Sequence, residues 1–217
     1  MTPPEVRLLR VAAQKLGVEV GDDALHRLTR FLDLLGVWNR RIHLTGGRDR
    51  EALLRHTIDS LAPAPHIPRM GSVVDVGTGA GFPGIVLGCL RPDLEIALIE
   101  SRRRRVSFLR EALRAIPLTA ARALEMRAEE AATAPELAGC VDVAIARALR
   151  LDLFLDLAVP FLGPRGMAIA MQTPRTAILA PALAASHGLR LAAKHDYTLP
   201  GGAARSLLLF DRCQAVP

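Results

Sequence analysis

The sequence predicts an α/β fold with a doubly wound, mostly parallel sheet, preceded by a helical cap. From about residue 71 onward, short apolar segments typical of strands alternate with segments of helical period, whereas residues 1–70 carry helical patterns. A glycine-rich turn follows the first apolar segment, which is where sheets of this kind bind ligands. We therefore expect an N-terminal helical cap over residues 1–70 and an α/β core over residues 71–217.

Three helices are expected in the cap. The best defined begins at Asp22 or Asp23 and continues through Trp38. Its apolar residues recur at helical spacing: Leu25, Leu28, Phe31, Leu32 and Leu35. Shorter helical runs cover residues 6–16 and 50–61, and a proline-rich link then ends the helical period. We interpret the leucine stripe as core packing, because these helices must cover a face of the sheet.

Seven strands are expected in the core, the last two forming an antiparallel hairpin. They are predicted at residues 73–76, 94–99, about 119–125, 141–145, 166–171, 189–197 and 205–211. Helices are expected between the earlier strands. Residues that follow the carboxyl ends of the parallel strands should meet at one rim of the sheet.

The glycine-rich turn is the most informative motif. Residues 73–84 read VVDVGTGAGFPG, an apolar run that passes into four glycines: Gly77, Gly79, Gly81 and Gly84. Glycine lets a backbone turn sharply and approach a ligand closely, and the turn lacks the Gly-Lys-Ser/Thr ending of a P-loop. The motif predicts a nucleotide cofactor that lies on the main chain.

Asp75, two positions before the first glycine, bears on which cofactor this is. A carboxylate there can address the cationic amino-acid end of S-adenosylmethionine, whereas it would repel a pyrophosphate. The third glycine also falls two rather than three residues after the second, unlike the dinucleotide motif. We therefore expect the Rossmann-like class I fold of S-adenosylmethionine-dependent methyltransferases. An NAD(P)-dependent oxidoreductase is the alternative.

Glu100 ends the second predicted strand, 23 residues after Gly77. A carboxylate at that place can accept both ribose hydroxyls of a bound adenosine, in NAD as well as in S-adenosylmethionine. The alternative is a solvated acid that balances the arginines after it.

The charge of the chain favours a polyanionic partner. The formal net charge is +6 and the pI is about 10.2, and almost all basic residues are arginines, since Lys15 and Lys194 are the only lysines. The guanidinium group suits phosphate and guanine edges, so nucleic acid is favoured over a small neutral substrate. The run Arg102–Arg105 opens a predicted helix, where it either meets RNA phosphate or is merely solvated.

Other features narrow the setting. The apolar stretches are shorter than the roughly 20 residues that cross a bilayer, and the first residues do not resemble a signal peptide, so we expect a cytoplasmic protein without a membrane partner. Cys89, Cys140 and Cys213 lack metal-ligand spacing, so buried reduced thiols are expected and no metal site. We expect the chain to act as a monomer.

Several segments together carry a resemblance to one family. They are Trp38-Asn39, His43-Leu44-Thr45, Arg48-Asp49, residues 55–60 (RHTIDS), residues 75–84 (DVGTGAGFPG), Arg104-Arg105-Val106 and Phe108-Leu109. With these residues the chain resembles, nearly end to end, the bacterial RsmG (GidB) family of 16S ribosomal RNA guanine-N7 methyltransferases.

The resemblance implies S-adenosylmethionine as cofactor and 16S ribosomal RNA or the small ribosomal subunit as partner. The cofactor contacts expected from the motif and the resemblance together are Asp75, Gly77, Gly79, Gly81, Phe82, Glu100, Ala128, Glu129 and Arg147. Contacts with RNA are expected from Arg104, Arg105, Arg127 and Arg205. Arg127 and Arg147 are the candidate catalytic residues.

The chain departs from the family pattern at three places. His43 stands where the family commonly has Asn, Arg103-Arg104 where it has Gly-Lys, and Gln172 where a lysine ends the fifth strand. If that lysine touches RNA phosphate, the neutral amide removes a charged contact. A second alternative is therefore an RNA-binding module that keeps the fold without catalysis.

The chemistry implied by the resemblance needs no general base, because guanine N7 already carries a lone pair. Proximity supplies much of the rate, and an arginine can hydrogen-bond guanine O6 to fix the ring, a role for Arg147 or Arg127. An ordinary strand-end ion pair is the alternative for Arg147. His56 and Asp59 share a helical face and either bond to each other or line the pocket, with a structural role favoured for His56. Trp38 is expected in the core.

Overall fold

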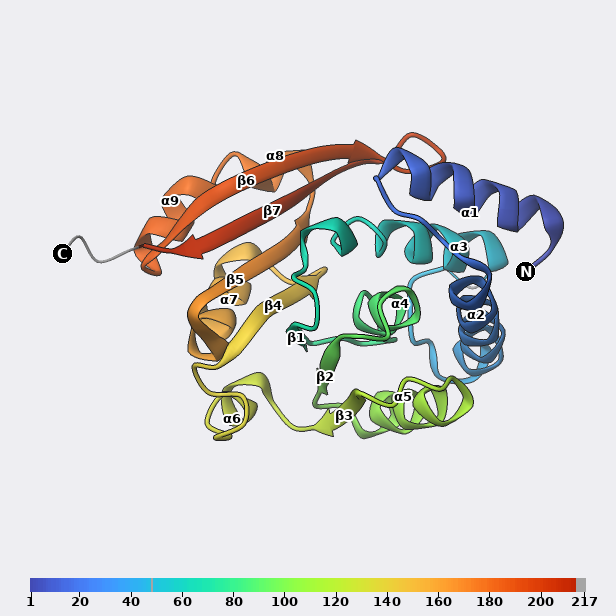
Figure 1. The fold of residues 1–217 in the computed structure, drawn as a ribbon, viewed down its shortest axis with the longest axis horizontal. Coiled ribbons are helices and arrows are strands. Elements are labelled where there is room, and N and C mark those ends of the chain that lie inside the picture. The colour runs from blue at the N-terminus through green and yellow to red at the C-terminus, as the bar shows by residue number, and fades with distance from the viewer. Residues whose placement is uncertain (48, 214–217) are drawn as a thin grey trace.

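The computed structural model describes residues 1–47 and 49–213 (Figure 1). Arg48, one of the residues that carry the family resemblance, lies outside the described residues.

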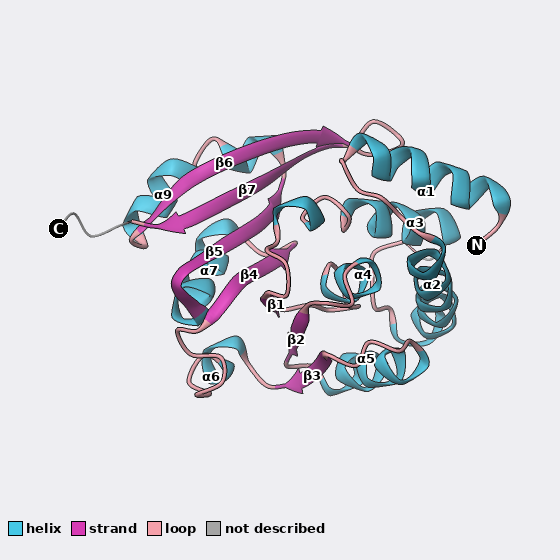
Figure 2. Cartoon of the chain, viewed as in Figure 1, coloured by secondary structure: helices cyan, strands magenta, loops and turns pink. Residues whose placement is uncertain are grey.

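The described residues form one seven-stranded sheet in the order β3-β2-β1-β4-β5-β7-β6 (Figure 2). The strands are β1 (Ser72–Val76), β2 (Glu95–Glu100), β3 (Ala121–Glu125), β4 (Val141–Arg147), β5 (Leu162–Gln172), β6 (Leu189–Thr198) and β7 (Ala204–Arg212). The first five are parallel, and β7 is antiparallel to both β5 and β6. This arrangement confirms the predicted fold class, including the closing hairpin.

The strand order reverses between β1 and β4. From β1 the chain passes outward to β2 and β3, then returns to β4 on the other side of β1 and continues outward to β5. The carboxyl ends of β1 and β4 therefore flank a crevice, the usual ligand position in a doubly wound sheet.

Helices cover both faces of the sheet (Figure 1). One face carries α1 (Pro3–Lys15), α2 (Asp22–Ile42), α3 (Arg50–Asp59), η1 (Ala64–His66), α4 (Gly84–Leu90) and α5 (Arg103–Ala115). The other carries α6 (Ala128–Ala131), α7 (Leu151–Ala158), η2 (Val159–Phe161), α8 (Pro174–Ala177) and α9 (Ala180–Ser186). Successive strand residues point to opposite faces, so Val73 joins the first core and Val74 the second.

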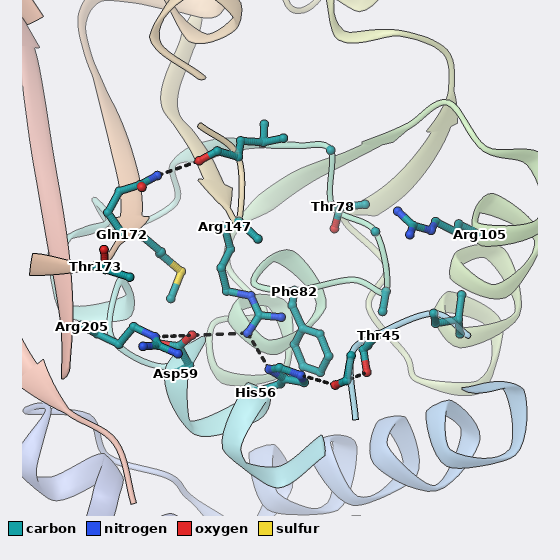
Figure 3. A pocket seen from close by; sticks show the side chains of 18 residues that line it. Thr45, His56, Asp59, Thr78, Phe82, Arg105, Arg147, Gln172, Thr173 and Arg205 are labelled. Atoms are coloured by element: carbon teal, nitrogen blue, oxygen red, sulfur yellow. Dashed lines mark hydrogen bonds and ion pairs between the residues drawn. The ribbon is translucent and has the colours of Figure 1, made fainter. Parts of the chain in front are cut away.

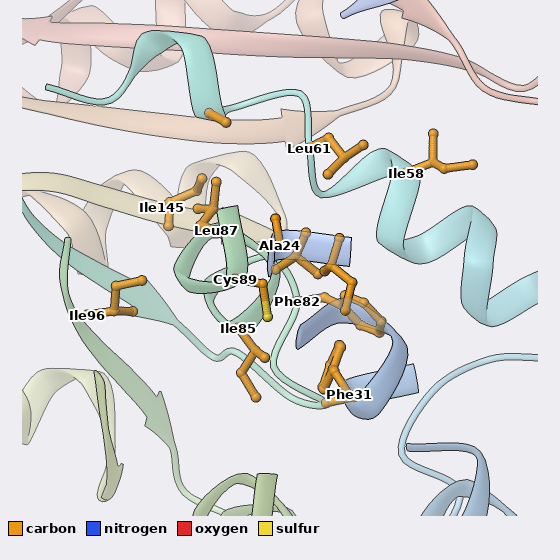
Figure 4. Packing of buried hydrophobic residues seen from close by; sticks show 14 of the residues in the cluster. Ala24, Phe31, Ile58, Leu61, Phe82, Ile85, Leu87, Cys89, Ile96 and Ile145 are labelled. Atoms are coloured by element: carbon orange, nitrogen blue, oxygen red, sulfur yellow. The ribbon is translucent and has the colours of Figure 1, made fainter. Parts of the chain in front are cut away.

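The N-terminal helices share a hydrophobic core with the sheet (Figure 4). Phe31 of α2 is fully buried and packs edge-on against Phe82, with ring centroids 5.4 Å apart. Phe108 of α5 lies 6.3 Å from the same Phe31 ring. The division of the chain at residue 70 stays a prediction, and the apolar core is continuous across it.

Two element boundaries differ from the prediction by four residues, and the other differences are smaller. Helix α2 continues beyond Trp38 to Ile42 and ends at His43, whose φ of 52° is left-handed. Strand β5 begins at Leu162, four residues earlier than expected, because it pairs with β4 through an irregularity. A Cβ on Gly166 would lie 2.6 Å from the Val141 carbonyl oxygen, so this close approach requires glycine.

In the described part of the chain, no helix combines the length and apolarity that a membrane crossing needs. All three cysteines are free thiols, as expected, but only Cys89 is buried, and burial raises the pKa of its thiol to about 12. Cys140 and Cys213 are exposed, so the expectation of three buried thiols was wrong for two of them. Across residues 1–47 and 49–213, no three His, Cys, Asp or Glu side chains gather as metal ligands would.

Candidate active site

The glycine turn leaves β1 at Val76 and forms one wall of a cavity. Gly77, Gly79 and Gly81 have φ values of +67°, +60° and +85°, which side chains disfavour. The turn lines a cavity of ≈ 510 Å³ through Gly77, Thr78, Gly79, Ala80 and Phe82. Gly81 and Gly84 are not among its lining residues. Two of the four glycines therefore shape the chain beneath the cavity, and two border the cavity.

Asp75 lies beneath the turn rather than in the cavity. Its carboxylate is fully buried, and Oδ2 accepts hydrogen bonds from the Gly84 amide (2.8 Å) and the Thr78 hydroxyl (2.5 Å). Burial raises the pKa of this carboxyl to about 6. In these positions Asp75 fixes the turn to the start of α4.

The second oxygen of Asp75, Oδ1, is buried without a hydrogen-bond partner among the described residues. A buried acceptor without a partner is costly and fits a site that a ligand donor completes. The contact expected between Asp75 and the amino end of the cofactor stays a prediction, and Oδ1 is the atom available for it.

Glu100 lines a second, smaller hollow of ≈ 180 Å³ beside the first. The carboxylate is 6% exposed, and accepts from the Arg102 amide (2.9 Å) and Arg105 Nη1 (3.2 Å). It is therefore a buried, partnered acid rather than a solvated one. The two hollows share Gly77 and Leu149 as lining residues, so they suit a ligand of two parts that crosses the turn.

Arg147, at the end of β4, lines the larger cavity (Figure 3). Its guanidinium carbon lies 4.8 Å from the centroid of the Phe82 ring, and Nη1 lies 3.2 Å from His56 Nδ1 and 3.4 Å from Asp59 Oδ2. Its side chain is 15% exposed, and burial lowers the pKa of the guanidinium while Asp59 raises it. An arginine remains charged under such conditions, so the cavity wall carries a fixed cation.

His56 connects Arg147 to the loop after α2. Its Nε2 lies 2.9 Å from the Gly46 carbonyl oxygen, which can only accept, so Nε2 carries the proton and Nδ1 accepts from Arg147. Burial lowers the pKa of His56, and the charge of Arg147 lowers it further. These contacts are those of a neutral, structural imidazole, the role favoured from the sequence.

Asp59 completes this wall of the cavity, and Tyr197, which does not line the cavity, contacts Asp59. The Tyr197 hydroxyl donates to Asp59 Oδ1 (2.8 Å), and Arg205 Nε lies 3.8 Å from Asp59 Oδ2. The sequence reasoning missed Tyr197. Its only signal was composition, because it is the single tyrosine of the chain. His56 and Asp59 do share a helical face, but each contacts Arg147.

Comparison with known families decides between a methyltransferase and an oxidoreductase. The family model described as rRNA small subunit methyltransferase G (GidB) matches residues 24–187. The chain belongs to this family. The NAD(P)-dependent oxidoreductase alternative is thereby overturned, as the glycine spacing had indicated.

Full-length relatives agree with the family model. The chain is 35% identical over 211 residues to a ribosomal RNA small subunit methyltransferase G of Geobacter sp. (strain M21), covering 94% of this chain and 96% of the relative. It is 33% identical to the protein of the same name from Deinococcus deserti, covering 100% of this chain and 92% of the relative.

Solved structures share the fold at low identity. TYW2 of M. jannaschii, solved in complex with AdoMet, superposes with a TM-score of 0.59 at 18% identity over 73% of this chain and 77% of that chain. A precorrin-6y C5,15-methyltransferase of Geobacter metallireducens GS-15 superposes with a TM-score of 0.54 at 16% identity, over 79% of this chain and 92% of that chain. Both likenesses place the chain in the Rossmann-like methyltransferase fold.

The arginines expected at the site do not all line the same cavity. Arg105, Arg147 and Arg205 line the larger cavity, whereas Arg127 is exposed at the N-cap of α6 and lines the smaller hollow. The two candidate catalytic arginines therefore lie on opposite sides of the glycine turn. Arg104 is exposed on α5 and lines neither hollow.

The remaining sequence candidates lie as follows. Ala128 and Glu129 line the smaller hollow with Glu100. Gln172, in place of the family lysine, lines the larger cavity and donates through Nε2 to the Leu149 carbonyl oxygen (2.9 Å). Trp38 is half-buried with its ring 5.8 Å from that of Phe108, a packing position as expected.

Proposed function

We propose that the chain transfers the methyl group of S-adenosylmethionine to N7 of a guanine in 16S ribosomal RNA, acting as a cytoplasmic monomer. Membership of its family makes it an S-adenosylmethionine-dependent methyltransferase of small-subunit ribosomal RNA. The acceptor atom, the residue roles and the oligomeric state are the proposed part.

The two hollows fit the two ends of the cofactor. The smaller hollow offers Glu100 to the ribose hydroxyls and the start of α6, at Ala128, to the base. The larger one offers the backbone of Gly77 and Gly79 to the amino-acid end, and the buried Oδ1 of Asp75 lies beneath the same turn. When bound, S-adenosylmethionine supplies an electrophilic methyl group that a nitrogen lone pair can take.

The placement of arginines supports RNA as the other substrate. Within the described residues, several arginines that follow the carboxyl ends of β2, β3 and β5 pair with no acidic side chain: Arg102, Arg103, Arg104, Arg127 and Arg175. Cations without an acidic partner attract phosphate, and these lie at the end of the sheet where the cavity opens.

The observation that carries the acceptor proposal is the fixed cation of Arg147 at the cavity wall. Guanine presents O6 beside N7, and a guanidinium that donates to O6 holds the ring while N7 keeps its lone pair. Because N7 loses no proton before it reacts, the protein need only align the base and exclude water. Among the described residues that line the cavity, His56 is the only histidine. Its two ring nitrogens contact the Gly46 carbonyl oxygen and Arg147, so neither is free to act as a base.

A methylation assay tests the proposal. Purified protein and cofactor labelled in the methyl group are incubated with free 16S RNA, with the assembled small subunit and with a control RNA. We expect label in one or both of the first two and none in the third. No incorporation into either ribosomal substrate would contradict the proposal, and size-exclusion chromatography with light scattering tests the monomer.

A catalytically inactive RNA-binding module remains the second candidate, favoured by one observation. Gln172 supplies no charge where the family commonly has lysine, and its amide is bonded to Leu149. This candidate predicts RNA binding in a filter assay without methyl transfer in the assay above.

A further inference from the structure

Asp59 lies where four elements meet beside the cavity. It ends α3, and its carboxylate faces Arg147 of β4 and Arg205 of β7 (Figure 3), as well as Tyr197 of β6. Oδ2 lies 3.4 Å from Arg147 Nη1 and 3.8 Å from Arg205 Nε, and Oδ1 accepts from the Tyr197 hydroxyl at 2.8 Å. The Asp59 side chain is only 7% exposed, so these contacts largely replace water.

The two arginines lack any other acidic partner. In the described part of the chain, Asp59 is the one carboxylate within ion-pair distance of Arg147, and the same holds for Arg205. Arg147 is otherwise held by neutral groups, the Phe82 ring and His56 Nδ1. Without the carboxylate, two guanidinium groups that line one cavity would repel each other in a partly buried setting.

We infer that Asp59 is a positioning residue for methyl transfer, which sets the directions of Arg147 and Arg205 toward the target guanine. The inference rests on the proposed function. Guanine N7 carries no proton for Asp59 to remove, so Asp59 is not a general base in this reaction. Both of its carboxylate oxygens are directed to protein donors. Its effect on the reaction therefore passes through the two arginines.

Tyr197 fixes Asp59 in turn. Its hydroxyl is partly buried beside the carboxylate, and burial raises the pKa of this phenol, so it stays a donor over the whole working range of pH. With Oδ1 engaged by Tyr197, Oδ2 is the oxygen directed to the arginines. Tyr197→Phe removes this one hydrogen bond and leaves every charge in place.

The first test is Asp59→Asn, which keeps the shape of the side chain and removes its charge. We expect the single-turnover rate of methyl transfer to fall by up to roughly 100-fold, the size typical of a small misplacement of the reacting groups. The KM for RNA should change less, because RNA binding is spread over exposed arginines that do not contact Asp59. Tyr197→Phe should lower the single-turnover rate by about 3- to 10-fold, which corresponds to the free energy of one hydrogen bond. This variant keeps the test informative if Asp59→Asn folds poorly.

Asp211→Asn is the matched control, because Asp211 lies on the same strand as Arg205 and pairs with the exposed Arg190. It should methylate RNA at the wild-type rate. If wild-type protein does not methylate 16S RNA, the proposed function fails; if wild type is active and Asp59→Asn is equally active, the positioning inference alone fails.

The decisive comparison combines Asp59→Asn with Arg147→Gln. If Asp59 acts through Arg147, the loss of rate in the double variant should be far smaller than the product of the two single losses. Single losses that multiply would mean that Asp59 acts independently of Arg147, and would overturn the inference.

Discussion

At the scale of single residues, we propose that the reaction depends most on Arg147. Its side chain is largely buried, stacks on Phe82, pairs with Asp59 and lines the cavity beside the glycine turn. Its charge is fixed before any substrate arrives, which is the arrangement that makes electrostatic contributions to catalysis large.

Arg147→Ala should therefore lose turnover far more than it loses the fold. We expect a decrease in kcat of about 100-fold, the size seen when one positioned donor is removed. Initial methylation rates and thermal unfolding of the same preparations test this. Arg190→Ala, which removes an exposed arginine at the far edge of the sheet, is the control and should keep its rate. Unchanged turnover in Arg147→Ala would remove this residue from the active site.

His56 gives the protein a specific pH dependence of stability. Its folded pKa is lowered by burial and by Arg147, so below about pH 6.5 the unfolded chain binds more protons at this position than the folded chain. The stability that this histidine contributes is complete above that pH and is lost as the pH falls through its folded pKa. Asp75, with its pKa raised to about 6, has the opposite slope, so the two partly cancel in the wild type.

His56→Gln separates the two contributions. Between about pH 5 and 6.5, the free energy of unfolding should rise more steeply with pH in the wild type than in the variant, by at most about 1.4 kcal/mol per pH unit. Denaturant titrations at several pH values measure this. Equal slopes in the two proteins would show that the pKa of His56 is not lowered in the folded state.

The sequence indicated most of the residues that line the site but not their contacts. Gly77, Glu100 and Arg147 were found because they follow strands, and the carboxyl ends of neighbouring parallel strands meet. Tyr197 was not found, because its contact with Asp59 joins residues 138 positions apart, across an antiparallel strand whose register no local pattern reveals.

At the scale of elements, the contact between β1 and α4 is what holds the glycine turn in place. Gly84 begins α4 directly against β1 and β2, and a Cβ there would lie 2.3 Å from Leu98 Cδ2 and 2.7 Å from Asp75 Oδ2. The last glycine of the motif is therefore needed for helix packing rather than for cofactor contact, a distinction that spacing alone could not make.

Gly84→Ala should destabilise the protein by about 1–3 kcal/mol, because the added methyl group overpacks a fully formed contact. Gly36→Ala, inside α2, is the matched substitution: its Cβ would meet only Leu53 Cδ1 at 3.9 Å, and we expect a gain of about 0.5–1 kcal/mol. Chemical denaturation of both variants measures the difference. Equal effects would contradict the packing role of Gly84.

Element types were predicted well and element ends less well. Short continuous apolar runs indicated the central strands β1, β2 and β4, because those strands are buried on both faces of the sheet. The start of β5 was misjudged because residues 163–166 include two glycines and a proline, which locally indicate a turn, whereas pairing with β4 carries the strand through them. Tertiary pairing here overrides the local preference.

At the scale of the whole molecule, part of the positive charge has a location that composition could not give. Within the described residues, a group of exposed arginines without acidic partners follows β2, β3 and β5 at the end of the sheet where the cavity opens, while others, such as Arg7, Arg69 and Arg165, lie elsewhere. RNA bound there would be held mainly through phosphate contacts, which release counterions and weaken with salt.

Arg103→Gln and Arg104→Gln should each lower the slope of log affinity against log salt for 16S RNA by about one. Binding of S-adenosylmethionine, measured by calorimetry, should remain unchanged, because neither side chain lines the two hollows. An unaltered salt slope would place the RNA on another face of the molecule.

The central claim is that the cavity beside the glycine turn methylates guanine N7 of small-subunit ribosomal RNA. The most direct measurement is to methylate 16S RNA and the assembled small subunit with labelled cofactor, digest the RNA to nucleosides and identify the labelled nucleoside by mass spectrometry. The account predicts label in 7-methylguanosine from a single position, strongly reduced with Arg147→Ala. Label in another nucleoside, or no label from active, folded protein, would contradict it.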